Sequence, residues 1–82
     1  MKTIHCYNDP GHAWARVPRK ELVRVGVAHL ISACSYQRGD NVFLEEDGDL
    51  QTYLRACNPR PTIVDHHTNK RSKIRNYEDY KL

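Results

Sequence analysis

The residues best suited to chemistry in this 82-residue chain lie in its last third, where imidazole and basic side chains are concentrated. Two adjacent histidines precede a basic run made up of Lys70, Arg71, Lys73 and Arg75. Charges of this kind bind phosphate groups, and an aromatic side chain such as Tyr77 offers a surface on which bases stack. We expect the segment to be either a docking surface or a solvated tail.

The two histidines, His66 and His67, raise a second possibility, metal-dependent hydrolysis. Asp65 before them completes part of a nuclease-type pattern. A full motif would need a further ligand on a following helix, and only the carboxylates Glu78 and Asp79 remain for that role. Neighbouring strand residues also point to opposite faces of a sheet. We therefore predict hydrogen-bonding roles for the histidines, with no catalysis, and keep a minimal hydrolase as an alternative.

The cysteines Cys6, Cys34 and Cys57 are widely spaced and odd in number. A secreted disulfide scaffold has a denser and even set, and structural zinc sites use closely paired ligands. We expect free thiols, no metal and no cofactor. Met1 leads directly into polar sequence, so we expect no signal peptide, and no apolar run approaches the ~20 residues of a membrane span. These features predict a cytoplasmic protein without membrane contact.

An acidic cluster stands before a predicted helix and consists of Glu45, Glu46, Asp47 and Asp49. Acidic side chains at a helix N-terminus complement the helix dipole, which is the simplest role for them. Two alternatives are a secondary contact with a basic partner and a divalent cation site, although the spacing of an EF-hand loop is missing. The net charge is only +3, so the distribution of charge matters more than its sum.

The elements that must position these residues are predicted from alternation, helical spacing and turn signals. The expected order is strands at 2–7 and 12–17, a helix at 18–25, strands at 32–36 and 42–45, a helix at 50–57 and a strand at 62–65. The second helix should bury one face formed by Leu50, Tyr53, Leu54 and Cys57. The pattern predicts a small single α+β domain, with a mostly antiparallel sheet of about five strands and two short helices on one face.

Residues 1–68 are expected to form the compact domain, and residues 69–82 a polar C-terminal segment that is first basic and then contains tyrosine and acid. Trp14 alternates with the small residues Ala13 and Ala15, so it should face away from the main core. It either seals a second small core or is an exposed anchor, because tryptophan is enriched at binding hot spots.

Four short motifs are spread along the chain: GHxWxxVP at 11–18, SYxxGD at 35–40, LEEDxD at 44–49 and HHTN at 66–69. Together they resemble a family of short bacteriophage and plasmid proteins, and the likeness covers most of the chain. The resemblance implies a setting on mobile elements rather than a mechanism. Small phage proteins are often inhibitors of host defence, including anti-CRISPR proteins.

From these observations we predict a small non-enzymatic binding protein that docks a host protein or nucleoprotein complex, as a phage-encoded inhibitor of host defence would. The predicted partner-binding residues are Trp14, Lys70, Arg71, Lys73, Arg75 and Tyr77, with the acidic cluster as a secondary contact. A small DNA- or RNA-binding regulator is an alternative from another class. An edge strand would also allow the protein to form a homodimer.

Overall fold

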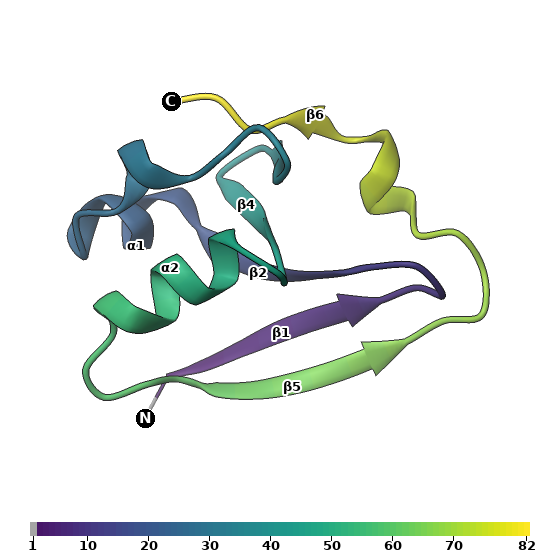
Figure 1. Ribbon diagram of the computed structural model, residues 1–82, viewed down its shortest axis with the longest axis horizontal. Helices are drawn as coiled ribbons and strands as arrows, with labels where there is room; N and C mark the ends of the chain where they lie inside the picture. The colour runs from purple at the N-terminus through teal and green to yellow at the C-terminus, as the bar shows by residue number, and fades with distance from the viewer. Residues whose placement is uncertain (1) are drawn as a thin grey trace.

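The computed structural model describes residues 2–82 and contains one six-stranded mixed sheet with two α-helices. The strand order across the sheet is β5-β1-β2-β4-β3-β6, so both edge strands, β5 and β6, come from the C-terminal part of the chain (Figure 1). β5 is parallel to β1, and the other neighbouring strands are antiparallel. The predicted α+β class is confirmed, with one strand more than expected.

The bounds of the elements are β1 (Thr3–Asn8), β2 (Ala13–Pro18), α1 (Arg19–Arg24), η1 (Ala28–Leu30), β3 (Tyr36–Arg38), β4 (Asn41–Glu45), α2 (Asp49–Ala56), β5 (Thr62–His67), η2 (Lys73–Asn76) and β6 (Glu78–Asp79), where η marks a 3₁₀ turn. The predicted first hairpin and both predicted helices are present within one or two residues. The strand predicted at 32–36 is wrong, because β3 begins only at its last residue.

Residues 32–35 form a loop because their serine side chains bond to Asp49 at the start of α2. The Asp49 carboxylate accepts hydrogen bonds from the backbone N–H of Ser32, from its hydroxyl and from the hydroxyl of Ser35, at 3.1, 2.8 and 2.5 Å. Ser35 Oγ in turn accepts from the backbone N–H of Glu45. Serine side chains that bond locally in this way compete with a strand ladder, and here they anchor the loop to α2.

The main core lies between the helices and one face of the sheet. Its strand side includes Ile4 and Leu44, and α1 contributes Leu22, whose side chain is fully buried. α2 contributes its predicted apolar face, with Leu50, Tyr53 and Leu54 buried and Cys57 half-buried at its C-terminal end. The helical spacing therefore identified the buried face of α2 correctly.

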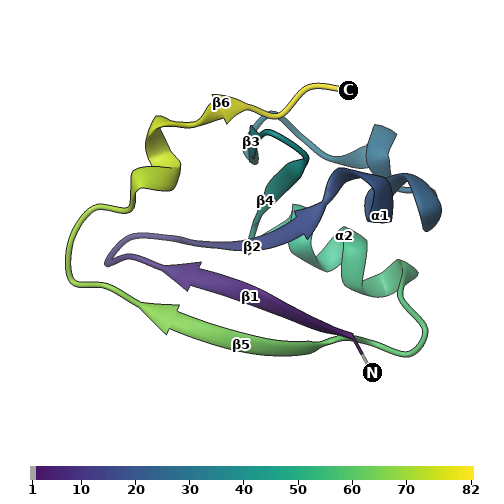
Figure 2. The same ribbon diagram turned by 180° about the vertical axis from the view of Figure 1, so that it is seen from behind.

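A second, smaller core covers the other face of the sheet and is made of Trp14, Phe43 and Ile74. Ile74 belongs to the C-terminal chain, which leaves β5, crosses the sheet through η2 and ends beside β3 (Figures 1 and 2). The hydroxyl of Tyr80, another buried residue of this chain, donates a hydrogen bond to the carbonyl of Ala28. This segment is therefore not a solvated tail throughout, because Ile74 and Tyr80 are buried.

Candidate nucleic-acid interface

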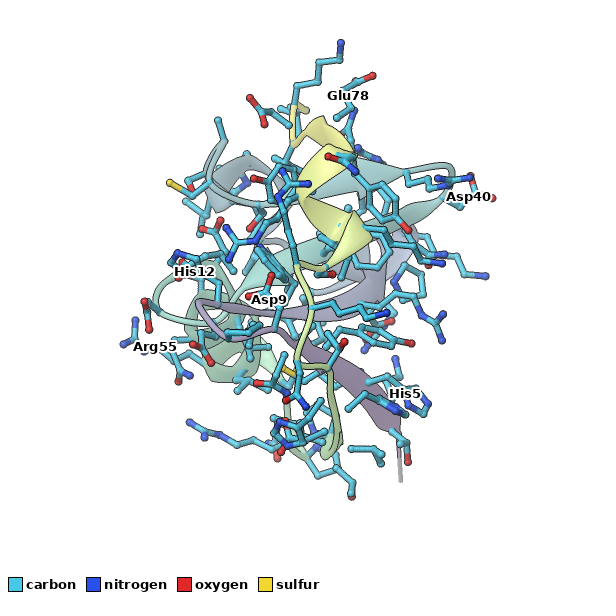
Figure 3. The ribbon with its side chains drawn as sticks, turned by 90° about the vertical axis from the view of Figure 1, so that its right-hand side faces the viewer. His5, Asp9, His12, Asp40, Arg55 and Glu78 are labelled. Carbon is cyan, nitrogen blue, oxygen red and sulfur yellow. The ribbon has the colours of Figure 1, made fainter. Side chains whose placement is uncertain are left out.

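The C-terminal chain is fixed to the β1–β2 turn by one buried carboxylate, that of Asp9. Oδ1 of Asp9 accepts hydrogen bonds from the backbone N–H groups of Gly11 and His12, at 3.0 and 2.9 Å. Oδ2 accepts from the backbone N–H of Ser72 at 3.0 Å and from Nε of Arg75 at 2.7 Å. Figure 3 shows Asp9 beside the C-terminal chain. These bonds hold the pKa of Asp9 well below its usual value, with Arg75 as the largest cause.

Two residues predicted to bind a partner have structural contacts instead: Trp14 belongs to the second core, and Arg75 packs against it. Trp14 is 2% exposed, and its ring lies 6.0 Å from that of Tyr36. The guanidinium of Arg75 lies 5.2 Å from the centre of the Trp14 ring, in a cation–π contact. The structure therefore places Trp14 in the seal of a second core, and Arg75 is occupied by Asp9 and Trp14 rather than available to a partner.

Tyr77 is half-buried and takes part in the same packing, which leaves only part of its ring accessible. Its ring lies 5.1 Å from that of Phe43 and 5.1 Å from the guanidinium of Arg38. By contrast, the side chains of Lys70, Arg71 and Lys73 are exposed. The predicted basic segment is thus divided between a structural cation, Arg75, and three cations that remain accessible.

Part of the open face of the sheet carries a row of aromatic and basic side chains, of which sequence reasoning selected only His66. His66 of β5 pairs with Tyr7 of β1, and their rings stack with centres 5.0 Å apart and planes inclined by 16°. The guanidinium of Arg16 in β2 lies 5.8 Å from the centre of the Tyr7 ring. Nδ1 of His5 is 2.9 Å from Nε2 of His66, so the two imidazoles form a hydrogen bond.

This row lies on the face opposite to the helices, as Figure 3 shows by the positions of His5 and of Arg55 from α2. A signal for it was present in the sequence, because His5 and Tyr7 alternate with buried positions in β1. The signal was incomplete, because only the parallel pairing of β5 with β1 brings His66 to the same place. That pairing joins strands far apart in the chain.

The row continues into a groove of about 500 Å³ beneath the C-terminal chain, which we call the basic groove. Its lining residues are Tyr7, Asn8, Arg16, Phe43, His66, His67, Thr68, Lys70, Arg71, Ser72, Lys73, Ile74 and Tyr77. No acidic side chain is among these lining residues. The groove therefore combines four permanent cations with aromatic surfaces, which is the combination that binds a nucleic-acid strand.

Several acids of the chain are engaged elsewhere, which explains how a groove of one sign forms on a protein of modest net charge. Asp9 is paired with Arg75, and Glu21 is paired with Arg24 at 2.5 Å. Glu78 lies 3.1 Å from the ammonium group of Lys81. The local charge of the basic groove is therefore more positive than the total of the chain suggests.

The acidic cluster is mostly committed to local structure. Asp49 is 6% exposed and accepts the serine hydrogen bonds described above, so its predicted role as a partner contact is wrong. The carboxylate of Glu45 accepts from the backbone N–H groups of Asp47 and Gly48, at 2.7 and 3.1 Å. Gly48 is the N-cap of α2 and makes no side-chain cap hydrogen bond, and Asp49 is the acidic residue in the first turn of the helix. Only Asp47 in the cluster is fully exposed, and Glu46 is half-buried.

The histidines and cysteines do not gather into one centre in the part of the chain that the structure describes. Within residues 2–82, no three His, Cys, Asp or Glu side chains are close enough to hold a metal ion. All three cysteines are free: Cys6 is buried, Cys57 half-buried and Cys34 exposed. Burial, followed by the charge of Asp65, raises the pKa of the Cys6 thiol to about 11.

Comparisons with known proteins add no relative to this picture. No protein-family model matches the chain, and searches among curated proteins and solved structures find no match. In residues 2–82, no helix has the length and apolar character needed to cross a membrane. The function is therefore argued from the geometry and charge of the basic groove.

Proposed function

We propose that this protein binds single-stranded nucleic acid in the basic groove and has no catalytic role there. The observation that carries the proposal is that Arg16, Lys70, Arg71 and Lys73 border one groove whose lining contains no acid. The sugar–phosphate backbone would lie along these cations. Counterion release from the phosphates would supply most of the affinity.

The aromatic row supports a single strand over a duplex. Tyr7 and His66 lie on the exposed sheet surface beside the cations, in strands β1 and β5. Bases stack on such rings only when they are unpaired, and the stacking tolerates any base because every base has a π-face. A groove that offers both rings and cations therefore suits an unpaired strand with little sequence preference.

The proposal is tested by fluorescence anisotropy with a labelled single-stranded oligonucleotide, as DNA and as RNA, and with the matching duplex. The variant Lys70→Ala/Lys73→Ala removes two cations of the groove. The matched control Arg55→Ala/Arg60→Ala removes two exposed cations at the end of α2 and in the following loop. The first variant should weaken binding strongly, and the second should bind like the parent protein.

The salt dependence of the binding constant measures how many phosphate contacts the protein makes. For a single strand, each phosphate contact adds about 0.7 to the slope of log K against log salt, so the groove variant should lose about 1.4. Equal losses in both variants would attribute binding to net charge and contradict the groove. If the oligonucleotide does not bind the parent protein, the proposal is wrong, and a host protein becomes the candidate partner of Lys70, Arg71 and Lys73. A pull-down from nuclease-treated host lysate would then identify that protein.

A further inference from the structure

β5 is an edge strand with two open faces and one open edge. All six of its residues are exposed, and they include the β-branched apolar side chains of Ile63 and Val64, at 38% and 39% exposure. β5 ends the strand order of the sheet, so within residues 2–82 its only strand neighbour is β1. An edge with these properties is a template for pairing with another strand.

The direction of the free backbone groups follows from the pairing with β1. The N–H of Thr62 donates to the carbonyl of Lys2 at 2.8 Å, and the N–H of Thr68 donates to that of Asn8 at 3.0 Å. In a parallel pair, both polar groups of a residue point to the same side and alternate along the strand. The N–H and C=O groups at positions 63, 65 and 67 therefore point away from the sheet.

The two edges of the sheet differ in their protection. β6, at the other edge, has only two residues, and both are acidic. Short length and charge are the features that keep edges from pairing. β5 is longer and contains no Lys, Arg or Pro. Its one carboxylate, on Asp65, is turned back toward β1, where Nδ2 of Asn8 lies 3.4 Å from it.

We infer that β5 pairs with β5 of a second copy of this chain, antiparallel and about a twofold axis at Val64. In this register, the outward N–H and C=O groups of position 63 in one copy bond to those of position 65 in the other. The two Val64 side chains then lie directly opposite each other. A shift by one step of the ladder would place the two Asp65 side chains opposite each other, and like charges in that position are destabilising. Charge therefore disfavours the register centred on Asp65, and the register with Val64 at the centre is the one we infer.

The twofold axis is perpendicular to the sheet, so the open faces of the two copies lie on the same side. Val64 and His66 are on one face of β5, because they are two residues apart in a strand. The dimer would therefore carry two aromatic rows on one continuous sheet surface, on either side of the paired Val64 residues. The contact is small, since it consists of one short strand from each copy, and it should be weak and concentration-dependent.

Sedimentation equilibrium over a range of concentrations tests the dimer without any ligand. The parent protein should show a reversible monomer–dimer equilibrium, and Val64→Lys should remain monomeric because it places two like charges on the axis. Val23→Lys is the matched control, since Val23 is an exposed apolar residue of α1, at 62% exposure. Far-ultraviolet circular dichroism verifies that each variant is folded.

A cross-linking experiment gives a second, independent readout. In a Cys34→Ser background, Val64→Cys should form a disulfide-linked dimer under mild oxidation. Ile63→Cys should form much less, because in this register residue 63 lies opposite Asp65 of the other copy. A parent protein that is monomeric at every concentration would overturn the inference. Equal dimerisation of the parent and Val64→Lys, or equal cross-linking at positions 64 and 63, would overturn it as well.

Discussion

The guanidinium of Arg75 and the carboxylate of Asp9 form a two-point ion pair, with Nε 2.7 Å from Oδ2 and Nη2 2.9 Å from Oδ1. The Asp9 side chain is 1% exposed, so the pair is shielded from solvent on the acid side. It joins the β1–β2 turn to the C-terminal chain and holds that chain over Trp14. The basic groove exists because this chain is fixed in place.

Arg75→Ala should therefore destabilise the fold much more than Arg71→Ala, although both remove one positive charge from the same segment. The first change leaves the Asp9 carboxylate with an unpaired charge and uncovers Trp14. By contrast, Arg71 is exposed, and its guanidinium donates a hydrogen bond to the side chain of Asn76. Urea unfolding followed by tryptophan fluorescence measures both variants. Equal effects would mean that the ion pair does not hold the segment.

The same pair predicts how stability depends on pH. The pKa of Asp9 is well below its usual value in the folded protein. A carboxylate of this kind contributes its full stabilisation above the unfolded pKa, about 3.9, and loses it as the pH falls toward the folded pKa. The free energy of unfolding should thus fall below about pH 4. At neutral pH, Asp9→Asn should have a lower free energy of unfolding than the parent protein. In acid, its free energy of unfolding should depend less on pH.

Glu21 has a second carboxylate with a lowered pKa, so its share of the acid dependence must be measured with a separate variant. Hydrogen bonds from Arg24 and then Lys2 lower the pKa of Glu21 to about 2. Glu21→Gln should therefore remove a separate part of the acid dependence. If Asp9→Asn retains the full slope of the parent protein between pH 5 and pH 2, the stabilising role of Asp9 is wrong.

The buried face of α2 makes Leu54 a sensitive position. Leu54→Ala removes a side chain that is 5% exposed within the main core, and should lower the free energy of unfolding by about 2–5 kcal/mol. Val23→Ala on α1 removes an exposed side chain and should change it by about 0.5 kcal/mol or less. Chemical denaturation measures both, and a loss below about 1 kcal/mol for Leu54→Ala would be inconsistent with the packing.

Tyr7 allows the stacking contribution to nucleic-acid binding to be separated from charge. Tyr7→Ala should weaken binding of a single strand by about 1–3 kcal/mol, the usual value of one base–aromatic stack, with no change in the salt slope. Tyr7→Phe keeps the ring and should bind like the parent protein. Titrations at several salt concentrations measure both quantities. Parent-like binding by the alanine variant would show that bases do not stack on this ring.

Local patterns were enough to predict the first hairpin, both helices and the buried face of α2, because each depends on neighbours in the chain. The candidate site was predicted only in part. The exposure of Lys70 and Lys73 agrees with the sequence pattern, but the burial of Trp14 depends on Ile74, far along the chain. Nothing in the local sequence of the basic run indicates that Arg75 will form an ion pair with a buried carboxylate, that of Asp9. Long-range pairing decided which cations were structural.

The three cysteines differ in burial, so their reactivity can report local unfolding of the domain. Only the thiolate reacts with alkylating reagents, and the pKa of Cys6 is about 11 inside the sheet. Cys34 on the surface should be modified at once, and Cys57 at the end of α2 when that helix frays. Modification of Cys6 requires that β1 separates from the helices that cover it. The order in which the three cysteines are alkylated, followed by mass spectrometry, would therefore show the order in which parts of the domain unfold.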